Sequence, residues 1–201
     1  MHAAARAAPR LVALRGAFVE AVARHEDPRR FQFVDETGLH LAFTRRDGRA
    51  PGGQRVGQGV RLRVGTPVTL VGAWTVKGLE AVMSLDGALN RNSFALYLDQ
   101  VLGPTLEPGD VIVLDNLPVH KVAGMAALVE ARGARLLFLP PYSPDFAPIE
   151  QAWSKLKTAL RTAMASTRHA WEQALDHAIT WITSQDAQKW FDHCGYHVHE
   201  P

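Results

Sequence analysis

The sequence predicts an α/β protein in which helices flank a mixed β-sheet. Short apolar runs that are typical of strands come first and follow one another closely, which favours antiparallel hairpins. From Val111 onward such runs alternate with segments whose apolar residues recur at helical spacing, and this alternation implies parallel strands. The 201 residues suffice for one sizeable domain at residues 31–201, preceded by an N-terminal helical segment at residues 1–30.

The first half of the chain is predicted to hold the antiparallel part of the sheet. A helix at residues 10–25 places Leu11, Leu14, Phe18 and Val22 at helical spacing. The strands that follow are predicted at residues 31–35, 39–44, 67–76 and 80–85, with a turn at Thr37-Gly38 between the first two. Strands this close in sequence are expected to pair as neighbours.

The second half is predicted to supply the parallel strands and most of the helices. Asn90 or Asn92 can cap a helix that carries Phe94 and Leu98 on one face. Buried strands are predicted at residues 111–114 and 136–139, on either side of a helix at residues 122–132. Three further helices are expected: one beginning near Pro148, one around Trp171 and one around Trp190.

Composition narrows the class of protein. The net charge is +2 and the isoelectric point is about 8.9, a weak indication of a polyanionic partner. The single cysteine, Cys194, excludes a disulfide within the chain and favours a reducing compartment. No apolar run reaches the roughly 18 residues that a membrane-spanning helix needs, so no membrane partner is expected.

A long basic segment separates the early strands. Residues 45–65 read RRDGRAPGGQRVGQGVRLRVG, without clear periodicity, and predict a loop rich in glycine and arginine. Flexible arginines suit contacts to phosphates, so Arg45, Arg46, Arg49 and Arg55 are candidate DNA-binding residues. A surface loop without any such role is the alternative.

Three acids stand at the ends of predicted core elements. Asp35 and Asp115 each end a predicted strand, and Glu150 lies in the first turn of a predicted helix. Phosphodiester chemistry is often catalysed by two divalent cations held by a few carboxylates, which these residues would supply. Each acid also has a structural interpretation, because acids are common in turns and are stabilising near a helix N-terminus.

Three motifs together resemble a known family. FVDETG, LDNLPVHK and LPPYSPDFAPIEQAWSKLK resemble the DDE transposases of the IS630 group, within the Tc1/mariner superfamily. The 34 residues between Asp115 and Glu150 resemble the separation of that superfamily's second Asp and final Glu. The resemblance covers residues 31–196, and its strength lies in the order and spacing of motifs that are individually weak.

The resemblance implies an RNase H-like fold and a metal-dependent reaction on DNA. It implies that Asp35, Asp115 and Glu150 hold two Mg²⁺ or Mn²⁺ ions, with Asn116 and His120 in supporting roles. The implied activity is cleavage of double-stranded DNA at transposon ends, followed by transfer of the freed 3′ end into target DNA. The implied setting is a homodimer in the bacterial cytoplasm, associated with the nucleoid.

Two features qualify this expectation. Only about 30 residues precede the first predicted strand, so helix-turn-helix DNA-binding modules are expected to be encoded separately. Lys157 and Arg161 share a helix face with Glu150 and are candidate DNA contacts, although a solvated face is an equally simple explanation. The alternatives are an RNase H-like nuclease without strand transfer and a truncated remnant that only binds DNA or dimerises.

Overall fold

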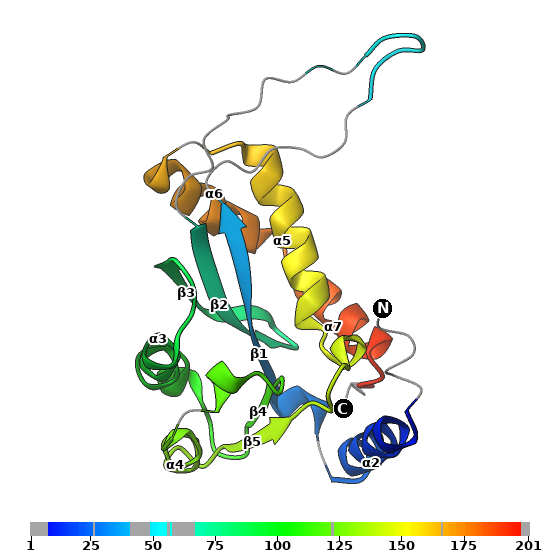
Figure 1. Cartoon of the computed structure of the whole chain (residues 1–201), viewed down its shortest axis with the longest axis vertical. Coiled ribbons are helices and arrows are strands. Elements are labelled where there is room, and N and C mark those ends of the chain that lie inside the picture. Colours follow the sequence, from blue (N-terminus) through cyan, green and yellow to red (C-terminus); the bar gives the residue numbers. More distant parts are fainter. Residues whose placement is uncertain are drawn as a thin grey trace.

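Figure 1 shows a mixed sheet with helices on both faces, in a computed structural model of the chain. The structure describes residues 8–25, 27–40, 49–55, 57, 67–121, 123–165 and 167–197. Its strands are β1 (Phe31–His40), β2 (Pro67–Thr75), β3 (Gly78–Asp86), β4 (Val111–Leu114) and β5 (Arg135–Phe138). Its α-helices are α2 (Pro9–His25), α3 (Arg91–Leu96), α4 (Met125–Glu130), α5 (Ile149–Ala163), α6 (Arg168–Thr180) and α7 (Ser184–His193).

The strands of the described residues form one sheet in the order β3-β2-β1-β4-β5. β1 pairs antiparallel with β2, and β2 pairs antiparallel with β3. β4 joins the other edge of β1 in parallel, and β5 continues this parallel half. The predicted mixed sheet is therefore confirmed, with hairpins early in the chain and crossover connections later.

Two hydrophobic cores lie on opposite faces of the sheet because side chains alternate along each strand. Phe33 of β1 and Val113 of β4 point to the face covered by α2, α5, α6 and α7, where Trp153 is almost completely buried. Val34 and Ile112, one residue along each strand, point to the face covered by α3, α4 and the π-helical turn η2 (Tyr97–Leu102). The two faces thus receive alternate residues of the same strands.

The predicted break in the first strand is wrong. The sequence favoured a turn at Thr37-Gly38 and a separate strand at residues 39–44. β1 instead continues to His40, because each residue from Phe33 to His40 has a partner on β2. Pairing across the sheet outweighs the local turn preference of Gly38. Residues 41–44 lie outside the described residues.

The helix predicted at residues 122–132 is shorter in the structure. α4 begins only at Met125, because Gly124 has a left-handed φ of 81° that is incompatible with helix continuation. Leu117 and the short 3-10 turn η4 (Pro118–His120) come before it. The other predicted helices and strands agree with the structure to within a few residues at their ends.

We predict that valine is tolerated at Gly38 but not at Gly72. A Cβ at Gly72 of β2 would lie 3.1 Å from both the Leu79 and the Trp153 side chains, whereas one at Gly38 meets nothing within 4 Å. Gly72→Val should therefore lower the free energy of unfolding by about 1–3 kcal/mol through overpacking. Denaturant unfolding of Gly72→Val and of the matched control Gly38→Val measures this difference. Equal midpoints for the two variants would contradict it.

Candidate active site

The register between β1 and β4 brings two acids side by side. Phe33 pairs with Val113, so two further residues along each parallel strand lead to Asp35 and Asp115. By strand alternation, both carboxylates fall on the face of the sheet that α5 covers. Asp115 immediately follows β4, which places it at the carboxyl end of a parallel strand, where ligands bind in open α/β sheets.

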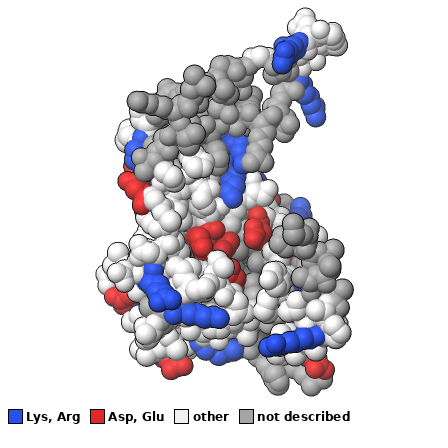
Figure 2. All heavy atoms as spheres, viewed as in Figure 1, with Lys and Arg blue, Asp and Glu red and all other residues white. Residues whose placement is uncertain are grey.

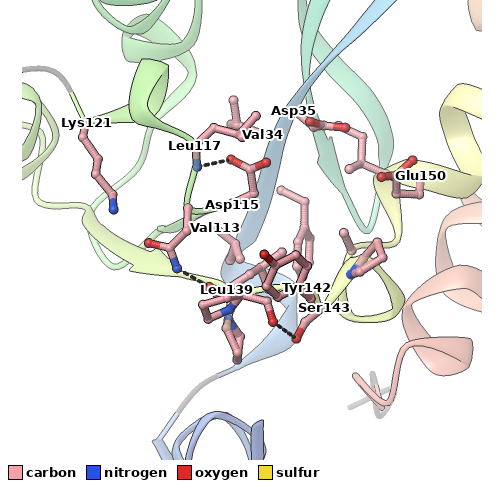
Figure 3. Close-up of a pocket in the computed structure, with 17 residues that line it drawn as sticks. Val34, Asp35, Val113, Asp115, Leu117, Lys121, Leu139, Tyr142, Ser143 and Glu150 are labelled. Atoms are coloured by element: carbon pink, nitrogen blue, oxygen red, sulfur yellow. Dashed lines mark hydrogen bonds between the residues drawn. The ribbon is translucent and has the colours of Figure 1, made fainter. Parts of the chain in front are cut away.

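The third acid comes from the helix on the same face. α5 packs against β1 through Ile149 and Trp153, and Glu150 lies in its first turn. Figure 3 shows Asp115 on one side of a cavity, with Asp35 and Glu150 on the other. The cavity has a volume of about 590 Å³, and all three acids line it. The structure therefore brings the three sequence-predicted acids to one place.

Acidic side chains gather near the middle of the face that Figure 2 shows, and basic side chains lie above and below them. This view shares its orientation with Figure 1, in which β1 and α5 run through the same region. A groove of negative charge bordered by positive charge suits a phosphate backbone held on both sides of a cation site.

Asp35 is the most strongly perturbed of the three acids. Burial raises the pKa of its carboxyl to about 7, with the nearby charges of Glu36, Glu150 and Asp115 adding to the effect. The indole of Trp153 donates a hydrogen bond from Nε1 to Asp35 Oδ2 over 3.0 Å. The orientation of this carboxylate is therefore set by the same helix that carries Glu150.

His120 connects the two faces of the sheet. Its ring is completely buried, with Nδ1 2.6 Å from Asp115 Oδ1 and Nε2 2.9 Å from Glu36 Oε2. Glu36 follows Asp35 and so points to the opposite face, where His120 packs against Phe94 at 4.7 Å between ring centroids. His120 therefore holds the Asp115 carboxylate through a hydrogen bond from the opposite side of the sheet.

The pKa values of Asp115 and His120 show that each shifts the other's charge state, with Glu36 adding to the effect on His120. Burial disfavours a charged imidazole, but the hydrogen bonds and charges of Asp115 and Glu36 raise the pKa of His120 to about 9. Burial likewise disfavours ionised Asp115, yet His120 and the Leu117 backbone N–H together lower its pKa. Both contacts engage Asp115 Oδ1, which leaves Oδ2 for the cavity. Asp115 is therefore ionised and oriented at neutral pH.

Asn116 joins the ends of the two parallel strands. Its side-chain Nδ2 donates to the backbone carbonyl of Leu139, just beyond β5, over 2.7 Å. The loop after β4 is thereby tied to the loop that leads to α5. Asn116 and His120, both singled out in the sequence as supporting residues, lie beside Asp115 and contact the site's framework rather than its centre.

The donor set has the chemistry that a hard divalent cation requires. Carboxylate oxygens are the preferred ligands of Mg²⁺ and Mn²⁺, and Mg²⁺ keeps several waters and needs few protein ligands. Burial is the main cause of the raised pKa of Asp35, and the nearby negative charges of Glu36, Glu150 and Asp115, which a cation would neutralise, add to it. As they stand, no three His, Cys, Asp or Glu side chains of the described residues are close enough together to hold a metal ion. The residues fit such an ion chemically, in an open arrangement.

Four of the six predicted DNA-binding residues belong to the described part of the chain, and they lie on two segments that are far apart in sequence. Arg49 and Arg55 are exposed in the segment between β1 and β2, and Lys157 and Arg161 lie half-buried along α5. Arg45 and Arg46 lie outside the described residues. Lys155, on the other side of α5, is engaged by Asp186 at 2.8 Å.

Several residues of the site were not assigned from the sequence. Lys121 and Tyr142 line the cavity, and Trp153, a core residue, also orients Asp35. Glu36 hydrogen-bonds His120. Two sequence features could have pointed to these residues: the motif that contains Lys121 and the adjacent acids Asp35 and Glu36. The hydrogen bonds between elements could not be inferred from spacing along the chain.

We predict that Asp35→Asn stabilises the metal-free protein at high pH. The pKa of Asp35 is raised on folding, so its ionisation costs stability as pH rises from about 4 to about 7, and the cost is complete above that window. The asparagine avoids this cost and can still accept the Trp153 hydrogen bond, so a gain of about 2–4 kcal/mol is expected at pH 8. Thermal unfolding in chelator at pH 4 and pH 8 tests this.

The control for that experiment is Asp115→Asn, which should destabilise the metal-free protein at high pH instead of stabilising it. The pKa of Asp115 is lowered on folding, so its charge stabilises the protein above its unfolded pKa, and the substitution should lower the melting temperature at pH 8. Stabilisation by both variants, or by neither, would contradict the charge distribution described above.

We also predict that removal of His120 destabilises the protein. His120→Ala leaves Asp115 and Glu36 without their shared partner, and the expected loss is about 2–3 kcal/mol, since both carboxylates keep some contact with water. His169, exposed on α6, is the control position for the same substitution. Unfolding midpoints for His120→Ala and His169→Ala that agree within error would show that the bridge carries no stability.

The fold resembles that of solved transposase structures. The Mos1 transposase paired-end complex with left transposon end has a TM-score of 0.71 at 16% identity, over 92% of this chain and 58% of that chain. The Mos1 strand transfer complex has a TM-score of 0.68 at 17% identity, over 92% and 57%. The catalytic domain of Mos1 mariner transposase has a TM-score of 0.62 at 16% identity, over 94% and 90%. The structural similarity shows that the fold is RNase H-like, as expected. At identities this low, the similarity shows the fold alone.

The remaining comparisons concern chain length, curated sequences, membrane spans and the family. The chain spans less than three fifths of the length of the Mos1 chains in the paired-end and strand transfer complexes. Comparison with curated protein sequences finds no significant match. No helix in the described ranges is long and apolar enough to cross a membrane. The family model for the DDE superfamily endonuclease matches residues 30–171, well over half of the sequence, and the chain therefore belongs to this family of DDE endonucleases.

Proposed function

We propose that this chain is the catalytic part of an IS630-like transposase, which cleaves transposon-end DNA and transfers the strand to a target. The observation that carries the proposal is the meeting of Asp35, Asp115 and Glu150 in one cavity from three separate core elements. A rigid framework of two strands and a helix suits a site whose ligands must be held in a defined geometry. The DDE endonuclease family is consistent with this chemistry.

The proposed roles follow from the contacts. Asp35, Asp115 and Glu150 would hold two Mg²⁺ or Mn²⁺ ions, which, when bound, activate water and stabilise charge on the attacking and leaving oxygens. Trp153 and His120 hold two of these carboxylates in orientation. Mos1 structures with Mg and with Mn support the choice of ion.

DNA is the proposed substrate. Lys121 at the edge of the cavity is positioned to contact a phosphate next to the scissile bond. Arg45, Arg46, Arg49 and Arg55 before β2, with Lys157 and Arg161 on α5, are proposed to contact the duplex further away. Such contacts would fix the position of the DNA without reading its sequence.

The proposal extends to partners. The Mos1 paired-end complex contains a left transposon end. A separately encoded helix-turn-helix part is proposed as the partner that recognises such an end. A homodimer that acts in the bacterial cytoplasm at the nucleoid completes the proposal.

We predict that the purified protein nicks supercoiled plasmid DNA in Mg²⁺ or Mn²⁺ and that Asp115→Ala does not. Loss of one metal ligand should reduce the rate by at least about a hundredfold, since ligand removal deprives the reaction of its main charge stabilisation. Asp176→Ala, an exposed position on α6, should nick like the parent and serves as the control. Gel separation of plasmid forms measures the rate.

The same assay separates the alternatives. A labelled oligonucleotide with a recessed transposon-like 3′ end, mixed with plasmid, tests whether the strand is joined as well as cleaved. Nicking without joining would identify a nuclease that lacks strand transfer. Salt-dependent DNA binding without any metal-dependent nicking, by a parent protein shown to be folded, would instead identify a non-catalytic remnant and refute the proposed function.

A further inference from the structure

The turn between β5 and α5 forms one wall of the cavity and also delivers Glu150. Pro140, Tyr142 and Ser143 line the cavity, and Figure 3 shows Tyr142 and Ser143 on the wall opposite Asp35. The short helix η5 (Pro144–Phe146) follows, and Glu150 comes four residues after Phe146. The position of the third acid therefore depends on the shape of this turn.

The turn holds a backbone conformation that needs support. Tyr142 has a φ of 56°, in the left-handed region that non-glycine residues adopt only at a cost in free energy. Its side chain is 58% exposed, so burial of the ring compensates little of that cost. Contacts from elsewhere in the molecule must keep the turn in place.

Tyr196 donates one hydrogen bond to the Phe146 carbonyl, over 2.8 Å. The contacts to the side chains of the turn described next come from α2, far away in sequence. Arg15 Nη1 donates to Ser143 Oγ over 2.6 Å and to Asp145 Oδ1 over 3.1 Å, while Nη2 donates to Asp145 Oδ2 over 2.5 Å. The same guanidinium lies 4.2 Å from the centre of the Phe146 ring. One side chain thus contacts three residues of the turn, two of them through directional hydrogen bonds.

The rest of α2 anchors this guanidinium. Phe18 stacks on Phe146 with ring centroids 5.4 Å apart, and Phe18 and Val22 are buried in the core beneath α5. Arg15 itself is only 22% exposed. A planar fork fixed at its base in this way holds its partners more firmly than a flexible surface charge would.

We propose that Arg15 is a positioning residue of the active site, which holds the Tyr142–Phe146 turn and thereby sets the place of Glu150. The inference rests on the proposed function, since Glu150 matters to the chemistry only as a metal ligand. It makes the N-terminal helix part of the machinery that arranges the acids. A displacement of α2 is accordingly transmitted to the cavity through one guanidinium.

The test compares two substitutions in the same helix. Arg15→Ala removes the hydrogen bonds to Ser143 and Asp145 and the guanidinium contact with Phe146, but leaves the Phe18–Phe146 stack. Val22→Ala, two helical turns further along, weakens the packing of α2 and leaves the guanidinium in place. Both variants should melt at a somewhat lower temperature than the parent. Only Arg15→Ala should weaken Mn²⁺ binding, by about tenfold, which is typical when a group that orients a metal ligand is lost.

Two readouts are measured on each protein. Titration with Mn²⁺, followed by the electron paramagnetic resonance signal of the free ion, measures metal affinity without any reaction. Plasmid nicking over a range of Mn²⁺ concentrations measures the half-saturating concentration, which a merely structural role would leave unchanged. Arg15→Lys keeps the charge but not the bidentate fork, and should fall between Arg15→Ala and the parent on both readouts.

Asp145 provides a second test of the same contact. If Arg15 acts through the turn, Asp145→Asn should weaken Mn²⁺ binding in the same direction, and the double variant should be little worse than Arg15→Ala alone. Additive effects of the two substitutions would mean that they act independently and would contradict the proposal.

The outcomes distinguish this inference from the proposed function. A folded parent that neither binds Mn²⁺ nor nicks DNA overturns both. A parent that binds and nicks, with Arg15→Ala and Arg15→Lys matching Val22→Ala in Mn²⁺ affinity, overturns only the role of Arg15. Weaker Mn²⁺ binding by Arg15→Ala, intermediate binding by Arg15→Lys and unchanged binding by Val22→Ala support it.

Discussion

Burial of the Asp35 carboxylate among other acids, at the end of the parallel strands, is the constraint on which this structure depends. Asp35 and Asp115 are brought together by strand register, and Glu150 is added by α5. Their cost appears in the pKa of Asp35, which burial and three neighbouring charges raise to about 7. A buried carboxylate with other acids around it costs stability, and such costs are typical of functional sites.

The neighbouring residues distribute this cost unequally. Asp115 is kept ionised by buried His120, which Glu36 braces from the opposite face of the sheet. Asp35 receives neutral donors, the indole N–H of Trp153 and the backbone N–H of Glu36, and its pKa stays raised. Asp115 is therefore ionised at neutral pH, while ionisation of Asp35 would be favoured by nearby positive charge. If the proposed metal site is correct, metal binding and stability are coupled through Asp35.

The three acids are held in place by different parts of the fold. The strand acids are fixed by the sheet, but Glu150 follows a strained turn that Arg15 of α2 helps to hold in place. The helix packs on the same core as α5 through Phe18. Through α2, the N-terminal helical segment predicted at residues 1–30 thus contacts the loop that forms the cavity wall.

The sequence by itself determined the mixed α/β class, most element positions and the three acids at element ends, because these follow from local periodicity and motif spacing. It could not predict that β1 runs unbroken through Gly38, since only pairing with β2 overrides the turn preference. Nor could it predict the roles of Trp153, Glu36 and Arg15, whose partners lie 118, 84 and 130 residues away in the chain. Tertiary structure alone decided these contacts, because hydrogen bonds depend on distances in space that local sequence patterns do not encode.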